Sequence, residues 1–327
     1  MTKTPVGISG LSVYVPPLRV WLDDWSQWTE NQWPKIREVV GRSFRMRGIN
    51  QSVYTMAANA VMRLIKQYDV DTTKIKFFAL GTESSTDNSA GAIIIKGMID
   101  QALISQGKLP ISRNCEVPEF KHACLGGVYA MKGALRQLAL DGSGYQAIVV
   151  CSDIAEYQLG TSGEPTQGAG AVAMLIEENP KLAEVDLKNS GSAADYRCID
   201  FRKPMLRFCN QKINENKQIQ DFPIFNGKYS TTCYIDETLQ ALNDMYLKRK
   251  LTPSTYMKSI KTLFLHRPYR RMPETTWATA YLFALSTGNS EERAELASYC
   301  YEAKIDPNDL IHEMQSKPRV SDLAQQT

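Results

Sequence analysis

Paired cysteines are missing from this chain, and histidine is scarce. The seven cysteines are scattered, with no Cys-x-x-Cys pair among them, so the sequence indicates no disulfide framework. The only histidines are His122, His266 and His312, and their spacing from the cysteines fits no zinc site. We therefore predict that no metal is bound and that the protein works in a reducing compartment, the cytoplasm.

Long apolar runs and strong charge are also missing. No window is long and apolar enough to span a bilayer, and the N-terminus lacks the pattern of a signal peptide. A formal net charge of +3 over 327 residues is too small to indicate nucleic acid or an acidic membrane surface as a partner. Hydrophobic residues make up 43% and charged residues 22%, which is ordinary for a globular protein with a sizeable core.

The hydrophobic pattern alternates between strands and helices. Residues 54–68 and 92–103 have helical patterns, as does the stretch that follows Cys124, whereas residues 6–15, 75–80, 146–152 and 168–178 resemble strands, with a further short strand near 114–117. Several of these strands are apolar throughout. The pattern predicts an α/β fold with a mostly parallel sheet covered on both faces, and chemistry near the carboxyl ends of its strands.

The later part of the sequence shows a similar order. Helices are predicted at 230–249 and 276–286, with a strand at 259–266 that ends in His266. Each part then contains helix and strand units with a reactive residue near a strand end. We therefore expect a duplicated fold, with one half at 1–180 and the other at 181–327.

Three residues have complementary chemistry. Cys124 precedes an amphipathic helix, whose start favours a thiolate; Glu83 follows an apolar strand in a Ser/Thr-rich loop; and His266 closes another strand. Each residue alone more often has a structural or surface role. Together they supply a nucleophile, an acid/base group and a hydrogen-bond donor, the set that acyl transfer with carbon–carbon bond formation needs.

Six segments in one order carry a family resemblance. GTESSTDNS, FKHACLGGVYA and VVCSDIAEYQLGTSGEPTQGAGAVAMLI are followed by DFRKP, NGKYSTTCY and LHRPYRRM. From about residue 6 to about residue 285 the chain resembles the 3-hydroxy-3-methylglutaryl-CoA synthases. The resemblance implies a thiolase-like fold, with two similar halves that each hold a mixed sheet between helices, and a homodimer.

The resemblance also implies a reaction. Cys124 takes an acetyl group from acetyl-CoA as a thioester, and Glu83 removes a proton from its methyl group. The enolate attacks the ketone of acetoacetyl-CoA, whose oxygen His266 holds, and water releases the product. Coenzyme A thioesters are the substrates, and no cofactor is required. The mevalonate route to isoprenoids is the expected setting.

Further positions are implied to bind coenzyme A. Thr166 matches the threonine of the family's Pro-Thr pair, and Ser162 stands where the family often has asparagine. Arg271 occupies the place of a phosphate-binding lysine, a role that arginine can also fill. Lys35 matches another lysine that contacts coenzyme A, whereas Thr275 replaces a second family lysine.

The C-terminal part departs from the family. We find neither the asparagine of its Gly-Asn pair nor its Tyr-Gly-Ser-Gly loop, so we expect a second half that is incomplete and exposes a sheet edge. Three alternatives stay open: the same condensation on an acyl carrier protein for polyketide β-branching, a relative of ketoacyl synthase III, and an inactive truncated homologue. Glu83 argues against the ketoacyl synthase, which usually pairs its cysteine with histidine and asparagine.

Overall fold

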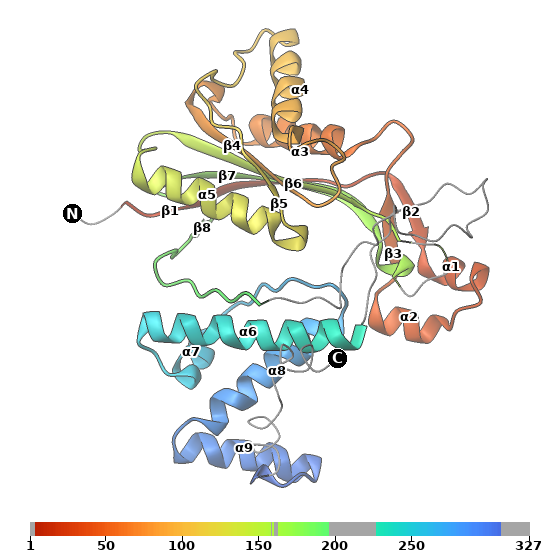
Figure 1. The fold of residues 1–327 in the computed structure, drawn as a ribbon, viewed down its shortest axis with the longest axis vertical. Helices are drawn as coiled ribbons and strands as arrows, with labels where there is room; N and C mark the ends of the chain where they lie inside the picture. The colour runs from red at the N-terminus through yellow and green to blue at the C-terminus, as the bar shows by residue number, and fades with distance from the viewer. Residues whose placement is uncertain (1–3, 158, 160–162, 196–226, 309–327) are drawn as a thin grey trace. The chain divides into compact units, whose positions relative to one another are not determined.

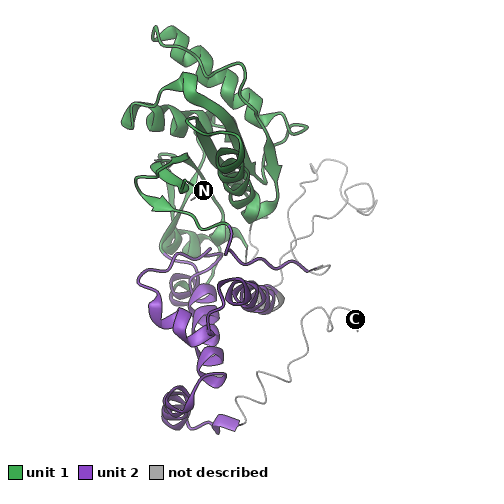
Figure 2. Cartoon of the chain, turned by 90° about the vertical axis from the view of Figure 1, so that its left-hand side faces the viewer, with its two compact units in different colours: residues 1–33, 42–187 green, residues 34–41, 188–327 purple. Residues whose placement is uncertain are grey.

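The computed structural model describes residues 4–157, 159, 163–195 and 227–308. It divides into two compact units, the first made of residues 1–33 with 42–187 and the second of residues 34–41 with 188–327 (Figure 2). The segment DFRKP and Ser162 lie outside the described residues.

A six-stranded sheet in the order β5-β4-β6-β7-β1-β8 forms the centre of the first unit (Figure 1). Its strands are β1 (Val6–Tyr14), β4 (Ile75–Thr82), β5 (Glu119–Lys121), β6 (Gln146–Ala155), β7 (Gly168–Glu178) and β8 (Ala183–Glu184). Strand β4 is parallel to β5 and β6, while β6–β7, β7–β1 and β1–β8 are antiparallel. The expectation of a mostly parallel sheet is therefore wrong, and the mixed sheet that the resemblance implied is confirmed.

Helices cover both faces of this sheet. Helices α3 (Val53–Gln67) and α4 (Gly91–Ser105) lie over one face, and α5 (Gly126–Leu140) lies over the other (Figure 1). Alternate residues of β4 serve the two sides: Phe78 and Leu80 pack with α3 and α4, whereas Phe77 and Ala79 pack with α5. This period of two explains why the strands are apolar throughout, because neither face meets solvent.

Smaller elements complete the first unit. Strands β2 (Leu18–Trp21) and β3 (Ser43–Met46) form an antiparallel pair beside helix α1 (Leu22–Trp28). The strand predicted near 114–117 is reduced to a single bridge between Phe77 and Glu116, because pairing with β4 continues only at Glu119.

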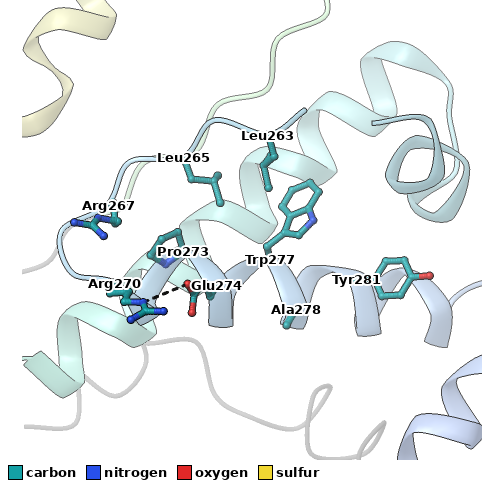
Figure 3. Close-up of a pocket in the computed structure, with 9 residues that line it drawn as sticks. All are labelled: Leu263, Leu265, Arg267, Arg270, Pro273, Glu274, Trp277, Ala278 and Tyr281. Carbon is teal, nitrogen blue, oxygen red and sulfur yellow. Dashed lines mark ion pairs between the residues drawn. The ribbon is translucent and has the colours of Figure 1, made fainter. Parts of the chain in front are cut away.

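The described part of the second unit is helical. It holds α6 (Gly227–Arg249), α7 (Pro253–Ser259), α8 (Arg271–Ser286) and α9 (Ser290–Ala303), together with most of α2 (Trp33–Val39). The strand predicted at 259–266 is wrong in this structure. Residues 260–267 are irregular, because none of the described residues pairs with their backbone as a neighbouring strand. Side chains of this segment and of α8 line a pocket (Figure 3).

Candidate active site

The parallel strands β4, β5 and β6 bring three functional groups to one edge of the sheet. Glu83 directly follows β4, Cys124 follows β5 in the short helix η2 (Ala123–Leu125), and Asp153 lies near the end of β6. The registers pair Thr82 with a residue of β5 and Gly81 with Cys151, so these strands end side by side. This is where ligands bind in open α/β sheets.

Asp153 holds the backbone that carries Glu83. One of its carboxylate oxygens, Oδ1, accepts hydrogen bonds from the Glu83 amide at 2.8 Å, from Thr82 Oγ1 at 2.9 Å and from Ser84 Oγ at 2.7 Å. Ser84 Oγ in turn accepts the amide of Ile154 at 2.8 Å. Hydrogen bonds to a carboxylate are stronger than neutral ones, so this network fixes the turn after β4.

A second network holds the far end of the Glu83 loop. Asp87 Oδ1 accepts the amides of Ala90 and Gly91 at 2.5 and 3.1 Å, at the start of α4. Glu119 of β5, whose side chain is only 1% exposed, accepts Ser85 Oγ at 3.0 Å and the Ala92 amide at 3.2 Å. Carboxylates are stabilising at a helix N-terminus, so both ends of the loop are anchored.

The backbone around Cys124 is tightly constrained. Ala123 has a φ of +37°, which is unfavourable for a residue with a side chain. Behind the nucleophile, the first turn of α5 approaches β4 so closely that a Cβ on Gly81 would lie 2.3 Å from the Gly127 nitrogen. Cys124 itself is exposed, as are its neighbours His122 and Leu125.

The thiol of Cys124 is a weaker acid than the helix start suggested. Although the residue is exposed, atoms packed around the sulfur desolvate it, and this raises the pKa of the thiol to about 11. The charges of Glu83 and Asp153 raise the pKa further, and a backbone hydrogen bond lowers it only in part. These effects oppose the thiolate that the helix start favours, because burial and two nearby carboxylates both disfavour the charged form of the thiol.

His266 belongs to the second unit and lies in the irregular segment after α7. Desolvation lowers the pKa of its imidazole, and its ring stacks on Tyr234 with the ring centroids 6.1 Å apart. Tyr234 also donates its hydroxyl to the His266 carbonyl oxygen at 2.6 Å. Because each unit is described by itself, the meeting of His266 with Glu83 and Cys124 stays a prediction.

The structure describes three of the four predicted coenzyme A contacts. Thr166 ends the short helix η3 (Glu164–Thr166) in the first unit, and its hydroxyl donates to the Gly163 carbonyl oxygen at 2.6 Å. Lys35 lies exposed on α2, and Arg271 begins α8. Arg271 forms an ion pair with Glu38, one turn beyond Lys35. The two predicted cations therefore lie on adjoining elements of the second unit, where a phosphate would compete with Glu38.

Asp153 is not among the site residues predicted from the sequence. Its register opposite the turn after β4 was the missing information, because only strand pairing shows that its carboxylate reaches the Glu83 amide. Among the described residues, no group of three or more His, Cys, Asp or Glu side chains could hold a metal ion. In the same part of the chain, no helix has the length and apolar character needed to cross a membrane.

Comparisons with known proteins agree with this arrangement. The sequence model described as hydroxymethylglutaryl-coenzyme A synthase N terminal matches residues 2–181. The hydroxymethylglutaryl-CoA synthase of Enterococcus faecalis is 28% identical over 268 residues, which cover 82% of this chain and 62% of that protein. The chain thus spans less than two thirds of that relative's length.

Solved structures resemble the chain as well. MvaS in complex with 3-hydroxy-3-methylglutaryl coenzyme A has a TM-score of 0.72 and 27% identity, over 92% of this chain and 71% of that one. The HMG synthase of the curacin biosynthetic pathway, in complex with acetyl donor-ACP, has a TM-score of 0.70 at 20% identity, over 90% and 68% of the two chains. The second likeness supports the thiolase-like fold alone. Since the family model covers more than half of the residues, the chain belongs to the hydroxymethylglutaryl-coenzyme A synthase family.

Proposed function

We propose that this protein condenses acetyl-CoA with acetoacetyl-CoA to give 3-hydroxy-3-methylglutaryl-CoA, as an acyltransferase of the mevalonate route. The observation that carries the proposal is the convergence of a nucleophile and a carboxylate at one sheet edge. Cys124 and Glu83 follow adjacent parallel strands, and the carboxylate is close enough for its charge to act on the thiol. Strand ends of this kind are the usual site of chemistry in such sheets.

The first step is acyl transfer to sulfur. The Cys124 sulfur attacks the acetyl carbonyl carbon, the bond to the coenzyme A sulfur breaks, and coenzyme A leaves as a thiol after taking up a proton. The raised pKa of Cys124 keeps its thiol protonated near neutral pH, so its proton must leave as the new bond forms.

Condensation and release follow. Glu83 removes a proton from the acetyl methyl group, and the enolate carbon bonds to the ketone carbon of acetoacetyl-CoA. The ketone oxygen, held by His266, takes up a proton and becomes a hydroxyl. Water then cleaves the thioester and restores the Cys124 thiol. Lys35, Thr166 and Arg271 would bind the coenzyme A portions, and the proposal includes no cofactor.

Intact-mass measurement tests the first step. After exposure to acetyl-CoA the chain should gain one acetyl group, which Cys124→Ala should abolish and Cys151→Ala should not. Glu83→Gln should retain acetylation but lose condensation by about a hundredfold or more, as expected for removal of a general base. Loss of both steps in Glu83→Gln would contradict the assignment. If neither acetyl-CoA nor an acetylated carrier protein acetylates the parent chain, the inactive alternative is correct.

An acyl carrier protein is the second candidate for the acyl donor. The curacin HMG synthase, solved with acetyl donor-ACP, shares the fold of this chain at a TM-score of 0.70. Acetyl-CoA and an acetylated carrier protein should therefore be compared as donors at equal concentration. Faster acetylation from the carrier protein would favour polyketide β-branching.

The expected homodimer also stays a proposal. Strand β5 is at the edge of the six-stranded sheet and pairs only with β4 among the described strands. Its other edge is available for a strand of a second copy. Sedimentation of the purified chain would measure the assembly directly.

A further inference from the structure

The strand that leads to the nucleophile also contacts the Glu83 loop. Strand β5 has only three residues, and its last residue, Lys121, lies beside the end of β4 and precedes Cys124 by three positions. Side chains alternate along a strand, so Glu119 and Lys121 lie on one face while Phe120 lies on the other, where it packs with side chains of β4 and α5. A group on β5 that holds the loop therefore also ties the loop to the nucleophile.

The ammonium group of Lys121 reaches the Glu83 loop directly. Its Nζ donates to the carbonyl oxygen of Asp87 at 2.6 Å and to that of Ser85 at 3.5 Å. The same nitrogen is 3.8 Å from Asp87 Oδ1 and 3.6 Å from Glu119 Oε1. Among the described residues, no other lysine or arginine forms an ion pair with either carboxylate. One cation therefore faces two backbone carbonyl groups and two carboxylates.

These two carboxylates meet at the start of α4. A Cβ on Gly91 would lie 2.9 Å from an oxygen of Glu119 and 3.1 Å from an oxygen of Asp87, so both acids face the same point. Their side chains are only 1% and 13% exposed, respectively. Carboxylates that are this close and this sheltered from water repel each other unless a cation compensates their charge. Lys121, with its side chain 32% exposed, is that cation.

The loop has a conformation that depends on contacts from outside it. Ser89 has a φ of +65°, which is unfavourable for a residue with a side chain and persists where the surroundings impose it. Asp87 holds the end of the loop by accepting the Ala90 amide. Desolvation tends to raise the pKa of Asp87. Hydrogen bonds from Tyr54 and the Ala90 amide, together with the charge of Lys121, outweigh desolvation and keep this pKa below its usual value.

We propose that Lys121 is a positioning residue for Glu83, whose loop it holds against the strand that precedes Cys124. Asp153 orders the beginning of the loop and Lys121 its far end, so the base and the nucleophile keep a fixed separation. Condensation needs that separation, because Glu83 must reach the acetyl group on Cys124, whereas acetyl transfer does not use Glu83. The catalytic consequence rests on the proposed function, but the contact between Lys121 and the loop does not.

Hydrogen exchange on the purified full chain tests this contact. Lys121→Met keeps the aliphatic stem and removes the charge, so the amides of residues 90–92, which two carboxylates accept, should exchange at least about tenfold faster. Lys121→Arg retains a cation with several donors and should keep most of the protection. The matched control is Lys76→Met, which removes a hydrogen bond to Ser112 near the other end of β4 and should leave these amides unchanged.

Measuring the two steps separately tests the catalytic consequence. In Lys121→Met, acetylation of Cys124 by acetyl-CoA should proceed close to the parent rate. Condensation should fall by about tenfold or more, as for a catalytic group that is slightly misplaced. Lys121→Arg should recover most of the condensation rate, because it restores the positive charge.

The pH profile of condensation distinguishes positioning from general loss of structure. The groups that face Asp87 are Tyr54 from α3 and Glu119 and Lys121 from β5. Desolvation and the bond to Asp87 raise the pKa of Tyr54, so its phenol stays neutral below pH 8. Removing the cation should raise the pKa of Asp87, so its carboxylate is lost at a higher pH. The acid side of the profile should therefore move to higher pH in Lys121→Met but not in Lys121→Arg.

Several results would overturn the proposal. Unchanged exchange at residues 90–92 in Lys121→Met, or an equal loss of protection in Lys121→Arg, would show that the charge does not hold the loop. An equal loss of acetylation and condensation, or a loss by the same factor at every pH, would indicate a structural role alone. If neither acetyl donor acetylates the parent chain, the proposed function fails, while the exchange measurement still decides whether Lys121 holds the loop.

Discussion

Three carboxylates determine the surroundings of the Cys124 nucleophile. Glu83 and Asp153 both raise the pKa of the Cys124 thiol, while Asp153 also orders the turn that carries Glu83. Glu119 holds the loop from the neighbouring strand. Glu83, the proposed base, and Asp153, which positions it, thus also raise the pKa of the Cys124 thiol through their negative charge.

Removing the Glu83 charge should make Cys124 more acidic. The pKa of the thiol, about 11 in the parent chain, should fall in Glu83→Gln because one of the charges that raise it is gone. Iodoacetamide alkylation of Cys124, followed by mass spectrometry from pH 7 to 11, should therefore have a lower midpoint. Glu156→Gln, at an exposed residue paired with Arg47, is the matched control and should leave the midpoint unchanged. An unchanged or higher midpoint in Glu83→Gln would be inconsistent with the geometry.

Asp153→Asn should loosen the turn after β4. Asp153 accepts three side-chain and backbone donors within 3.0 Å, and losing its charge weakens all of them. We expect the free energy of unfolding to fall by about 1.5–3 kcal/mol, the range for hydrogen bonds to charged groups. The amides of Glu83 and Ser84 should exchange faster with solvent.

The control for this variant is Asp71→Asn. Asp71 is exposed, caps the short helix η1 (Thr72–Lys74) and, among the described residues, accepts hydrogen bonds only from Thr73. Because asparagine is also a good capping residue, this change should have little effect. If both variants lose the same stability, or if exchange at Glu83 is unaffected, Asp153 does not position the loop.

At the level of elements, the contact between β4 and α5 brings Glu83 and Cys124 together. Gly81 and the first turn of α5 meet backbone to backbone, with no room for a side chain. The first turn of α5 begins with Gly126, and the helix then packs Ala130 and Ala134 against the sheet before its larger Leu135 and Leu138. Small residues allow α5 to approach closely, which places the nucleophile near the strand end.

Gly81→Ala should therefore be strongly destabilising. The new Cβ would lie 2.3 Å from the Gly127 nitrogen and 2.5 Å from the Gly126 carbonyl carbon, and a backbone cannot move aside as a flexible side chain can. We expect a loss of about 1–3 kcal/mol or more in urea unfolding, as for other overpacked cores. The rate at which iodoacetamide alkylates Cys124 should also change, because α5 must shift to accommodate the new Cβ.

Gly97→Ala is the matched control, with the same chemical change on an exposed position of α4. No atom lies within 4 Å of the Cβ that it adds. This variant should be more stable than the parent chain by about 0.5–1 kcal/mol, the difference in helix propensity. If Gly81→Ala is as stable as the parent chain, β4 and α5 do not approach as described.

For the whole molecule, desolvated thiols should make the free energy of unfolding depend on pH in the alkaline range. Desolvation raises the pKa of Cys115, Cys124 and Cys151 to about 11 in each case. The folded state thus retains protons that the unfolded state, with a thiol pKa of about 8.5, has already lost. The stability from these thiols is complete below the unfolded value and is lost as pH rises through the folded value.

Urea unfolding under reducing conditions from pH 7.5 to 10.5 would measure this loss. The double variant Cys115→Ala and Cys151→Ala should show a shallower decline with pH than the parent chain. Comparing the two slopes removes the contribution of other alkaline groups, which both chains share. Parallel slopes would mean that these thiols are not protected from ionisation.

Local pattern in the sequence was sufficient for most elements and for the choice of Glu83 and Cys124. Period-two and period-3.6 hydrophobicity located β4, β6, β7, α3 and α5 within a few residues, since each of these elements buries its own apolar side chains. The motifs around Glu83 and Cys124 led to the family that the comparisons confirm. The same local pattern predicted a strand at 259–266, and there it was wrong.

Tertiary structure alone decided which groups meet. A strand needs a partner for its backbone, and residues 261–265 have none among the described residues, so an apolar pattern was not enough to form one. The role of Asp153 depends on strand register, and the acidity of Cys124 depends on two carboxylates and on packing around its sulfur. Hydrophobic periodicity is a property of neighbouring residues in the chain, whereas pairing, desolvation and charge depend on residues that folding brings from far apart.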